Sequence, residues 1–201
     1  MAPTRLLVAV LLLAGPLLGQ EAQLTIPPRD AQLTIRPPEG PRIRFPDLPV
    51  VTQEGEEVSF YEDLVADKVV AITVISTTCR TACPAMAIMF SELQELLGEA
   101  AGRDVHLISI SADPVTDTPA RLKEWGDRFH AGPGWTLLTG GEKEIGLILK
   151  ALKGPTSHVE DHYALVLYGS DRSGDWIHSY SPPSASRLVE RLRTFQTRPE
   201  S

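Results

Sequence analysis

The chain has 201 residues, of which 42% are hydrophobic and 22% are charged, a balance that excludes collagen-like and wholly disordered proteins. Its formal net charge of −7 argues against binding to nucleic acid or to anionic membranes by bulk charge. The two cysteines, Cys79 and Cys83, can form neither a disulfide-rich scaffold nor a four-thiolate zinc site within one chain. We therefore expect the two sulfurs to act together at one place.

Residues 1–20 have the pattern of a secretory signal peptide. Arg5 precedes an apolar run over residues 6–18, and Gly15 and Pro16 interrupt this run before it is long enough to span a bilayer comfortably. We expect cleavage near residues 19–22 and a mature protein that is periplasmic or otherwise extracytoplasmic, where disulfides persist. The alternative is an uncleaved N-terminus, which would then provide membrane association.

Residues 21–43 are expected to form a proline-rich, extended linker. The sequence Ala22–Ile26 recurs as Ala31–Ile35 among clustered prolines. Two copies are too few for a solenoid, so we interpret the repeat as a local duplication within the linker. The globular domain is expected over residues 44–197.

Hydrophobic periodicity in the globular domain predicts alternating strands and helices. Continuous β-branched runs predict buried strands over Val69–Ile75 and Val105–Ile110, and apolar residues at helical spacing predict a helix over Pro84–Leu97. The other expected elements, in chain order, are a strand over Val58–Tyr61, a helix over Thr118–Phe129 capped by Thr116 or Asp117, a strand over Trp135–Leu138, a helix over Glu142–Leu152, strands over Tyr163–Tyr168 and Asp175–Ser179, and a helix over Ser184–Phe195. This order predicts an α/β fold of three layers, in which helices flank a central mixed sheet.

The cysteine pair falls between the buried strand Val69–Ile75 and the helix that follows it. Pro84 is tolerated in a first helical turn, so both sulfurs are expected in the loop and first turn at a helix N-terminus. Free backbone N–H groups and the helix dipole favour a thiolate there. Because residues four positions apart share a helix face, the sulfurs can close a disulfide or hold one metal ion.

Three interpretations of the pair are open from the residues themselves. A structural disulfide would close a very small loop and gain little from loop entropy. A redox dithiol suits a strand-to-helix junction, although the common redox motif spaces its cysteines by two residues and this one by three. A metal site needs a further ligand, and two thiolates with an imidazole suit copper, because sulfur stabilises Cu(I) and nitrogen helps to accommodate Cu(II).

The spacing of the histidines does not select a third ligand. The sequence has five: His106, His130, His158, His162 and His178. The first two and the last fall in or beside expected elements, where a structural or solvated role is the simpler interpretation. Met86 and Met89 lie on the apolar stripe of the helix after the cysteines, and we expect them in the core rather than at a metal.

Four segments, in order, resemble the signatures of the Sco/SenC family of copper proteins. They are Thr78–Pro84, with its Cys-x-x-x-Cys-Pro pattern, Ile108–Pro119, with Ser-x-Asp-Pro followed by Asp-Thr-Pro, Gly134–Gly140, and Asp161–His162 before an expected strand. The resemblance runs from Phe45 to Phe195. As a departure, the segment Val74–Thr78 lacks the aromatic residue that is common before the first cysteine.

The resemblance implies a thioredoxin-like fold and copper, as Cu(I) or Cu(II), bound by Cys79, Cys83 and His162. His158, which is only four residues from His162 in the same expected loop, is the rival third ligand. It also implies a copper chaperone that delivers copper to the CuA site of cytochrome c oxidase or reduces that site. The expected partner is the oxidase subunit that carries CuA or another copper protein, and the two cysteines are expected to be redox-active as well.

The alternative function is a periplasmic thiol–disulfide oxidoreductase, in which one cysteine attacks a target disulfide and the other resolves it. A peroxidase of the same fold is a weaker alternative, because no proline precedes Cys79 at the interval of the Pro-x-x-x-Thr-x-x-Cys pattern. The remaining class is a non-catalytic interaction domain. It would be favoured if both cysteines were buried and inert to alkylation.

Overall fold

The computed structural model describes residues 43–153, 165–180 and 184–196. In chain order its elements are β1 (Pro49–Thr52), β2 (Glu57–Ser59), α1 (Phe60–Leu64), β3 (Val69–Ile75), α2 (Ala82–Leu97), the 3-10 turn η1 (Gly98–Ala100), β4 (Val105–Ser111), α3 (Pro119–Arg128), β5 (Trp135–Thr139), α4 (Glu142–Lys153), β6 (Val166–Ser170), β7 (Asp175–Ser179) and α5 (Ala185–Gln196). Within these ranges no helix is both long and apolar enough to cross a membrane. The expected signal peptide and linker lie outside the described residues.

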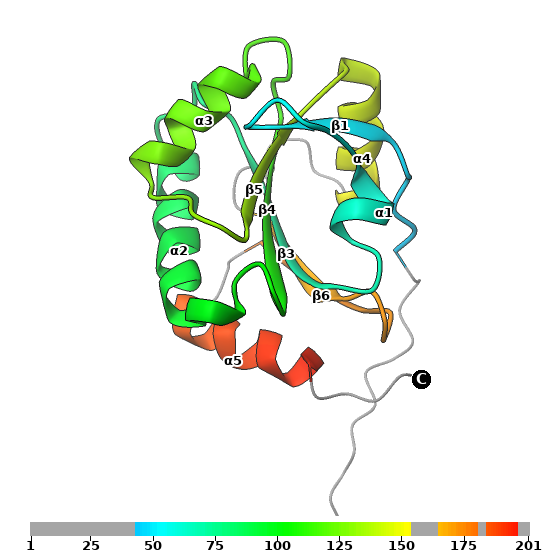
Figure 1. Cartoon of the computed structure of the whole chain (residues 1–201), viewed down its shortest axis with the longest axis vertical. Coiled ribbons are helices and arrows are strands. Elements are labelled where there is room, and N and C mark those ends of the chain that lie inside the picture. Colours follow the sequence, from blue (N-terminus) through cyan, green and yellow to red (C-terminus); the bar gives the residue numbers. More distant parts are fainter. Residues whose placement is uncertain (1–42, 154–164, 181–183, 197–201) are drawn as a thin grey trace, which may run out of the picture. The chain divides into compact units, whose positions relative to one another are not determined.

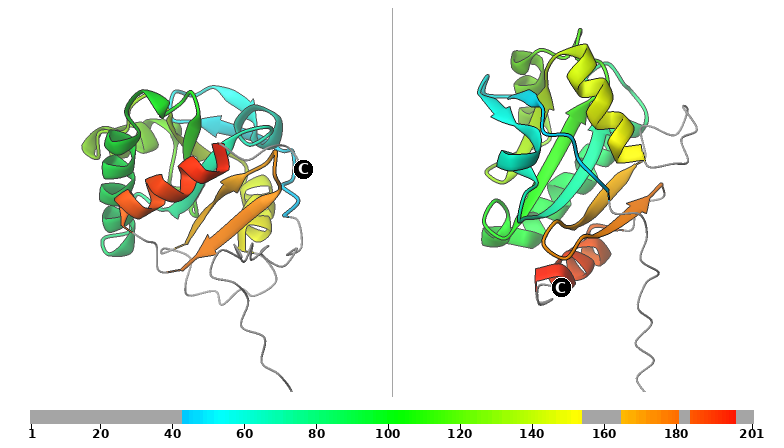
Figure 2. Two further views of the ribbon diagram at one scale, coloured as in Figure 1. Left: turned by 90° about the horizontal axis from the view of Figure 1, so that it is seen from below. Right: turned by 90° about the vertical axis from the view of Figure 1, so that its right-hand side faces the viewer.

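The described strands form one seven-stranded sheet in the order β2-β1-β5-β4-β3-β6-β7. β3, β4 and β5 are parallel to one another, whereas β1, β2, β6 and β7 pair antiparallel with their neighbours. Helices α2, α3 and α5 cover one face of this sheet, and α1 and α4 cover the other (Figures 1 and 2). The prediction of a three-layer α/β fold with a mixed sheet is therefore confirmed.

The central strand β3 positions the segment that carries the cysteines. All seven of its residues are buried, as the continuous β-branched run predicted, because β4 and β6 flank it and helices cover both of its faces. The chain leaves β3 at Ile75 and enters α2 at Ala82. The cysteine loop consequently lies at the carboxyl end of the parallel strands.

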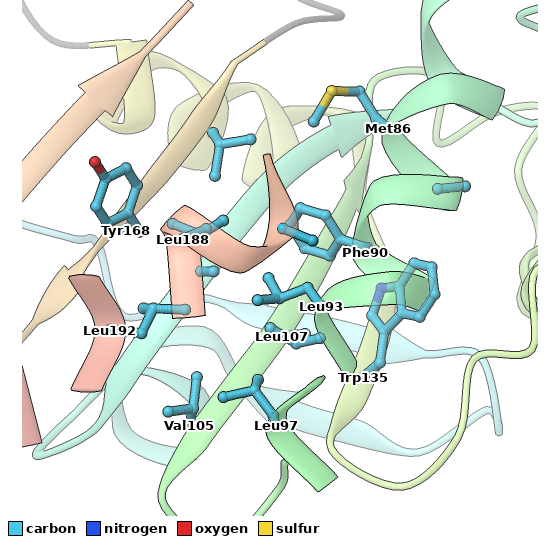
Figure 3. Packing of buried hydrophobic residues seen from close by; sticks show 14 of the residues in the cluster. Met86, Phe90, Leu93, Leu97, Val105, Leu107, Trp135, Tyr168, Leu188 and Leu192 are labelled. Carbon is cyan, nitrogen blue, oxygen red and sulfur yellow. The ribbon is translucent and has the colours of Figure 1, made fainter. Parts of the chain in front are cut away.

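On the α2 side, apolar residues from three helices and the sheet form the α2-face cluster. Phe90 and Leu93 of α2 pack with Leu188 and Leu192 of α5, and the rings of Phe90 and Trp135 lie 5.7 Å apart between centroids (Figure 3). The α2 and α5 side chains among them belong to the apolar faces of the two predicted helices. Burial of this stripe fixes α2 against β3 and β4.

The two methionines of α2 lie with this cluster. Met86 is buried within the α2-face cluster and Met89 is partly buried against it, which confirms the prediction that both pack in the core. Leu96, which the helical stripe also included, is instead 48% exposed. The stripe is therefore narrower at the end of α2 than the sequence predicts, because Leu93 and Leu97 already fill the contact with the sheet.

The opposite side of the sheet carries a second cluster, the α4-face cluster. Phe60 of α1 and Ile145 and Ile148 of α4 pack there on Val70 and Ile72 of β3. The cluster is extended by Phe45, whose ring meets that of Trp176 edge-on with 4.7 Å between centroids. Both faces of β3 are thus covered by apolar side chains.

Helix α1 corrects the strand predicted over Val58–Tyr61. The strand β2 ends at Ser59, and Phe60 begins a helix. The Asp47 carboxylate accepts hydrogen bonds from the backbone N–H groups of Tyr61 and Glu62, which satisfies free donors at the helix start. This contact comes from outside the segment, so the aromatic and β-branched composition of the segment gave the wrong prediction.

The start of α3 and the strand β6 also differ from expectation. Thr118, not Thr116 or Asp117, is the N-cap of α3, and its hydroxyl accepts a hydrogen bond from the backbone N–H of Arg121 at 3.4 Å. β6 spans Val166–Ser170 rather than Tyr163–Tyr168, and residues 163 and 164 lie outside the described ranges. The strand extends past Gly169 because this residue pairs closely with Trp176 of β7.

A close contact with a second glycine explains why the segment Gly134–Gly140 begins with a glycine. Gly134 has a φ of 92° and lies against Gly102 in the turn before β4. A Cβ atom on Gly134 would overlap the backbone of residues 101 and 102. Only glycine combines this left-handed conformation with such a close approach of two chain segments.

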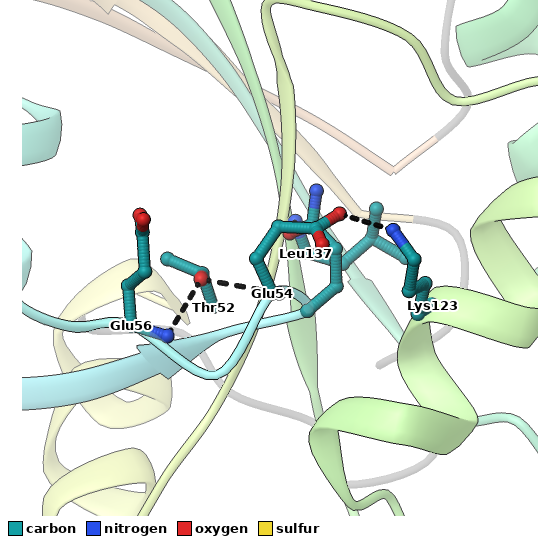
Figure 4. Close-up of polar contacts among 6 residues, drawn as sticks. Thr52, Glu54, Glu56, Lys123 and Leu137 are labelled. Carbon is teal, nitrogen blue, oxygen red and sulfur yellow. Dashed lines mark hydrogen bonds and ion pairs between the residues drawn. The ribbon is translucent and has the colours of Figure 1, made fainter.

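The turn between β1 and β2 is held by Thr52, and the strand β1 before it is an element that the sequence did not predict. Its hydroxyl accepts hydrogen bonds from the backbone N–H groups of Glu54 and Glu56, both at 3.3 Å (Figure 4). The Glu54 carboxylate in turn pairs with Lys123 of α3 at 2.5 Å. This hairpin places β1 beside β5 at one side of the sheet.

Candidate metal centre

The two cysteines lie together where the chain passes from β3 to α2. Cys79 is in the connecting loop, Thr81 is the N-cap residue, and Cys83 and Pro84 are in the first turn of the helix. This is the placement that the sequence predicted. Both cysteines are free thiols in this structure.

The Cys79 sulfur lies at the positive end of α2 and is partly exposed. It accepts a hydrogen bond from the backbone N–H of Cys83 at 3.4 Å, and the Thr81 hydroxyl is 3.9 Å away. Partial burial acts to raise the pKa of Cys79, but hydrogen bonds from the Cys83 side chain and from the N–H groups of Thr81 and Cys83 outweigh it and lower the pKa to about 7. Near neutral pH this sulfur is therefore available as a thiolate.

The Cys83 sulfur has the opposite character. The residue is 0% exposed and belongs to the α2-face cluster. Burial, followed by the hydrogen bond to Cys79 and the negative charges of Cys79 and Asp117, raises its pKa to about 12. The expectation that the helix N-terminus favours a thiolate is thus right for Cys79 and wrong for Cys83, because desolvation of the buried sulfur outweighs the helix dipole.

The loop before Cys79 is held by a carboxylate that sequence reasoning treated only as a possible helix cap. Asp117 is 0% exposed and accepts hydrogen bonds from the backbone N–H and hydroxyl of Thr77 and from the hydroxyl of Ser111. Since Thr77 follows β3 and Ser111 ends β4, Asp117 joins the carboxyl ends of two parallel strands. The available signal for this contact was a pair of hydroxyl residues at the carboxyl ends of two parallel strands, Thr77 just after β3 and Ser111 at the end of β4.

The third ligand predicted from the family resemblance, His162, lies outside the described residues, as does its rival His158. Among the residues that the structure does describe, no group of three or more His, Cys, Asp or Glu side chains can hold a metal ion. The described donor set is therefore two sulfurs, one partly exposed and one buried. Soft sulfur donors of this kind fit Cu(I), which requires few ligands.

None of the three described histidines forms a group with the cysteines that could hold a metal ion. The Nε2 atom of His178 lies 2.7 Å from the carbonyl oxygen of Leu152. His106 lines a hollow of about 430 Å³ with Lys68 and Arg103, at the opposite end of β3 from Cys79, and burial lowers its pKa. His130 follows the C-cap of α3 and has a left-handed conformation with a φ of 58°. These settings agree with the structural roles expected for the three residues.

The mixed sheet, its two helical layers and the cysteine pair at the start of α2 define a thioredoxin-like protein with a paired-cysteine centre. The SCO1/SenC family profile matches residues 46–172, and the chain belongs to this family. The resemblance noted in the sequence is therefore confirmed.

Individual relatives are consistent with this assignment. The "SCO1 protein homolog" of Bacillus subtilis is 35% identical over 89 residues, a match that spans 44% of this chain and 45% of the relative's length. The copper-bound structure of ScoI from Bradyrhizobium japonicum is 25% identical and superposes with a TM-score of 0.61, covering 75% of this chain and 98% of ScoI. BsSco, 24% identical with a TM-score of 0.61 over 78% of this chain and 95% of its own, is described as a cytochrome c oxidase assembly protein with a disulfide switch.

Proposed function

We propose that this protein binds copper through Cys79 and Cys83, with the His162 imidazole as the third ligand, and delivers it during assembly of the CuA site of cytochrome c oxidase. The observation that carries the proposal is the cysteine pair at the start of α2 in a member of the SCO1/SenC family. Two relatives support it, since ScoI has been crystallised with copper bound and BsSco is described as an oxidase assembly protein. The apolar N-terminal run supports an extracytoplasmic location.

The two sulfurs contribute differently to metal binding. Cys79, with a pKa of about 7, presents a thiolate to an arriving cation, whereas Cys83, with a pKa of about 12, must release its proton as the metal binds. Copper uptake is therefore coupled to proton release, mainly from Cys83 near neutral pH. Because Cys79 is partly exposed and Cys83 is buried, Cys79 is also the sulfur that a partner protein's ligands reach first.

Copper loading of the reduced protein tests the metal site. The Cys79→Ser, Cys83→Ser and His162→Ala variants are each expected to weaken Cu(I) binding sharply in competition with a chromogenic Cu(I) chelator, and the cysteine variants should lose the thiolate-to-Cu(II) absorption band. His158→Ala is the matched control and should bind as the wild type does. Stoichiometric copper retained by His162→Ala, with copper lost from His158→Ala, would exchange the two histidine assignments.

Delivery requires a separate measurement. The Cu(I)-loaded protein is mixed with the copper-free CuA domain of an oxidase subunit, the two proteins are separated, and the copper content of each is measured. Transfer by ligand exchange leaves copper as Cu(I), so copper should appear in the CuA domain without free copper and without an added oxidant or reductant. A domain that stays copper-free while the donor stays loaded would argue against the chaperone role and leave metal binding intact.

The asymmetry of the two thiols favours thiol–disulfide exchange as the second candidate function. The Cys79 thiolate would attack a target disulfide and form a mixed disulfide, releasing one target thiolate. Cys83 would then lose its proton and attack the Cys79 sulfur, which yields the Cys79–Cys83 disulfide and the second target thiol. The target gains two electrons and the pair loses two. Comparison of the pair's reduction potential with its Cu(I) affinity distinguishes the two functions.

A further inference from the structure

Asp117 is a fully buried carboxyl group beside the cysteine pair, and the proposed copper site does not use it as a ligand. Its side chain is 0% exposed. Within the described ranges no lysine or arginine forms an ion pair with it. Burial of an unpaired carboxylate costs free energy unless hydrogen bonds compensate for the lost water. The groups that donate to Asp117 therefore indicate what it does.

Most of the hydrogen bonds to Asp117 come from one residue of the cysteine loop. The backbone N–H of Thr77 lies 3.2 and 3.3 Å from the two carboxylate oxygens, and the Thr77 hydroxyl donates to Oδ1. The Ser111 hydroxyl donates to Oδ2 at 2.6 Å and ties the carboxylate to the end of β4. The Thr77 hydroxyl also accepts a hydrogen bond from Arg121 at 3.3 Å. Thr77 is thus fixed to β4 and α3 through its side chain and its backbone.

The constraint on Thr77 reaches Cys79 through a tight turn. The backbone N–H of Cys79 donates to the carbonyl oxygen of Ser76 at 3.2 Å, so the turn closes around Thr77. Beyond it, the N–H of Cys83 points at the Cys79 sulfur at 3.4 Å. Because this turn is short and hydrogen-bonded, a displacement of Thr77 displaces the Cys79 sulfur relative to the start of α2.

We propose that Asp117 is a positioning residue that acts through Thr77 to hold the Cys79 sulfur at the start of α2, ready for its ligand. The identity of that ligand as copper rests on the proposed function, whereas the placement of the sulfur does not. Asp117 is then equivalent to the outer-sphere groups that orient metal ligands elsewhere, and its hydrogen bonds matter more for the chemistry of Cys79 than for the stability of the fold.

A second carboxylate provides a matched control. Asp171 accepts hydrogen bonds from the Tyr61 hydroxyl at 3.2 Å and from the backbone N–H of Asp67 at 3.1 Å. It is partly buried in the turn between β6 and β7. Its backbone N–H donates a hydrogen bond to the carbonyl oxygen of Lys68, the residue before β3. Asp171→Asn therefore perturbs a similar set of hydrogen bonds at the end of β3 that is remote from the cysteines.

The test compares the Asp117→Asn, Thr77→Val, Thr77→Ser and Asp171→Asn variants in the reduced protein. Cu(I) affinity is measured against a chromogenic chelator, and the rate of Cys79 alkylation by iodoacetamide is measured at neutral pH without copper. Asp117→Asn and Thr77→Val should each lower Cu(I) affinity about tenfold or more and slow the alkylation of Cys79. The double variant should be no worse than the more affected single variant, because the two residues act through one contact. Thr77→Ser, which keeps the hydroxyl, and Asp171→Asn should match the wild type in both measurements.

Folded Asp117→Asn and Thr77→Val proteins with wild-type affinity and wild-type alkylation rates would overturn the proposal. Equal losses in Asp171→Asn would also overturn it, since they would trace the effect to general destabilisation. Should Asp117→Asn fail to fold, Thr77→Val carries the same test without disturbing a buried charge. A wild-type protein that binds no copper would refute the proposed function, and the alkylation rates would still decide the role of Asp117.

Discussion

The two faces of the sheet are covered by similar apolar clusters, but both cysteines lie with only one of these clusters. The α4-face cluster is made of aliphatic and aromatic side chains around Phe60, whereas the α2-face cluster includes Cys83 and has Cys79 packed at its margin. The difference arises because α2 begins at the carboxyl end of β3 and runs along one face only. One helix start therefore holds a thiol inside the core and another at its edge, and burial of the first together with hydrogen bonds to the second separates their reactivities.

The largest effect expected from this comparison is the difference in reactivity between the two thiols. At pH 7 Cys79, whose pKa is lowered to about 7, is substantially ionised, whereas Cys83, whose pKa is raised to about 12, stays almost wholly protonated. Brief treatment of the reduced native protein with iodoacetamide should therefore label Cys79 alone, as measured by mass spectrometry of peptides. Denatured protein, the control, should be labelled equally at both. Equal labelling of the native protein would contradict the assigned burial of Cys83.

A pair of core substitutions tests whether the two clusters differ in function as well as in content. Phe90→Ala in the α2-face cluster and Phe60→Ala in the α4-face cluster each empty a site that is 0% exposed. Each should lower the free energy of unfolding by about 3–5 kcal/mol, measured by urea denaturation. Only Phe90→Ala should also change the alkylation rate of Cys79, because Phe90 belongs to the helix that carries the cysteines.

The test depends on how far the alkylation rate of Cys79 differs between the Phe90→Ala and Phe60→Ala proteins. If Phe60→Ala alters Cys79 as strongly as Phe90→Ala does, the sheet transmits the disturbance between its faces and the clusters are not independent. A conservative Phe90→Leu protein is expected to recover much of the lost stability, since it refills most of the cavity.

A smaller effect is expected in the pH dependence of stability, which reports on the partly exposed thiol, Cys79. The pKa of Cys79 falls from 9.0 to about 7 on folding, so its thiolate stabilises the fold above pH 9 and this contribution is lost as the pH falls through 7. Cys83, whose pKa rises to about 12, contributes in the opposite sense and loses its contribution as the pH rises above 9. From pH 7 to pH 9, the reduced wild type should gain unfolding free energy relative to Cys79→Ser. Parallel curves for the two proteins would refute the lowered pKa.

The smallest effect is expected at the ion pair between Glu54 and Lys123, which lies outside both clusters. Their side chains are 52% and 49% exposed, so water and salt screen the attraction. Alanine substitution of either residue should leave the thermal midpoint almost unchanged, and a double-mutant cycle should show a coupling that disappears at high salt. A large coupling that persists in salt would show that this hairpin contributes to the stability of the domain.

The elements that the sequence predicted well are those whose signal is local and strong. β3 and β7 have the predicted bounds, because a continuous β-branched run and a clear turn mark them. α1 was missed because Asp47, which satisfies its first N–H groups, lies outside the helical segment. The bounds of β6 moved because pairing of Gly169 with Trp176 extends the ladder through a residue that usually marks a turn.

At the candidate site, the motif predicted the position of both cysteines but not their difference. The spacing places Cys79 and Cys83 together at the helix start, whereas the burial that raises the pKa of Cys83 depends on how α2 packs with α5 and the sheet. The role of Asp117 likewise depends on the pairing of β3 with β4, which no local pattern specifies. His162 as third ligand stays a prediction from the family resemblance.

The contact between Thr77 and Asp117 joins residues forty positions apart in the chain. An excised peptide containing β3, the loop and α2 would include both cysteines and the helix start, yet it would lack the carboxylate that fixes the loop. The loop can be ordered in this way only after β4 has paired with β3, when the entropy of closing the intervening segment has been overcome. During folding, both thiols are therefore present in the chain before the arrangement that distinguishes them is formed.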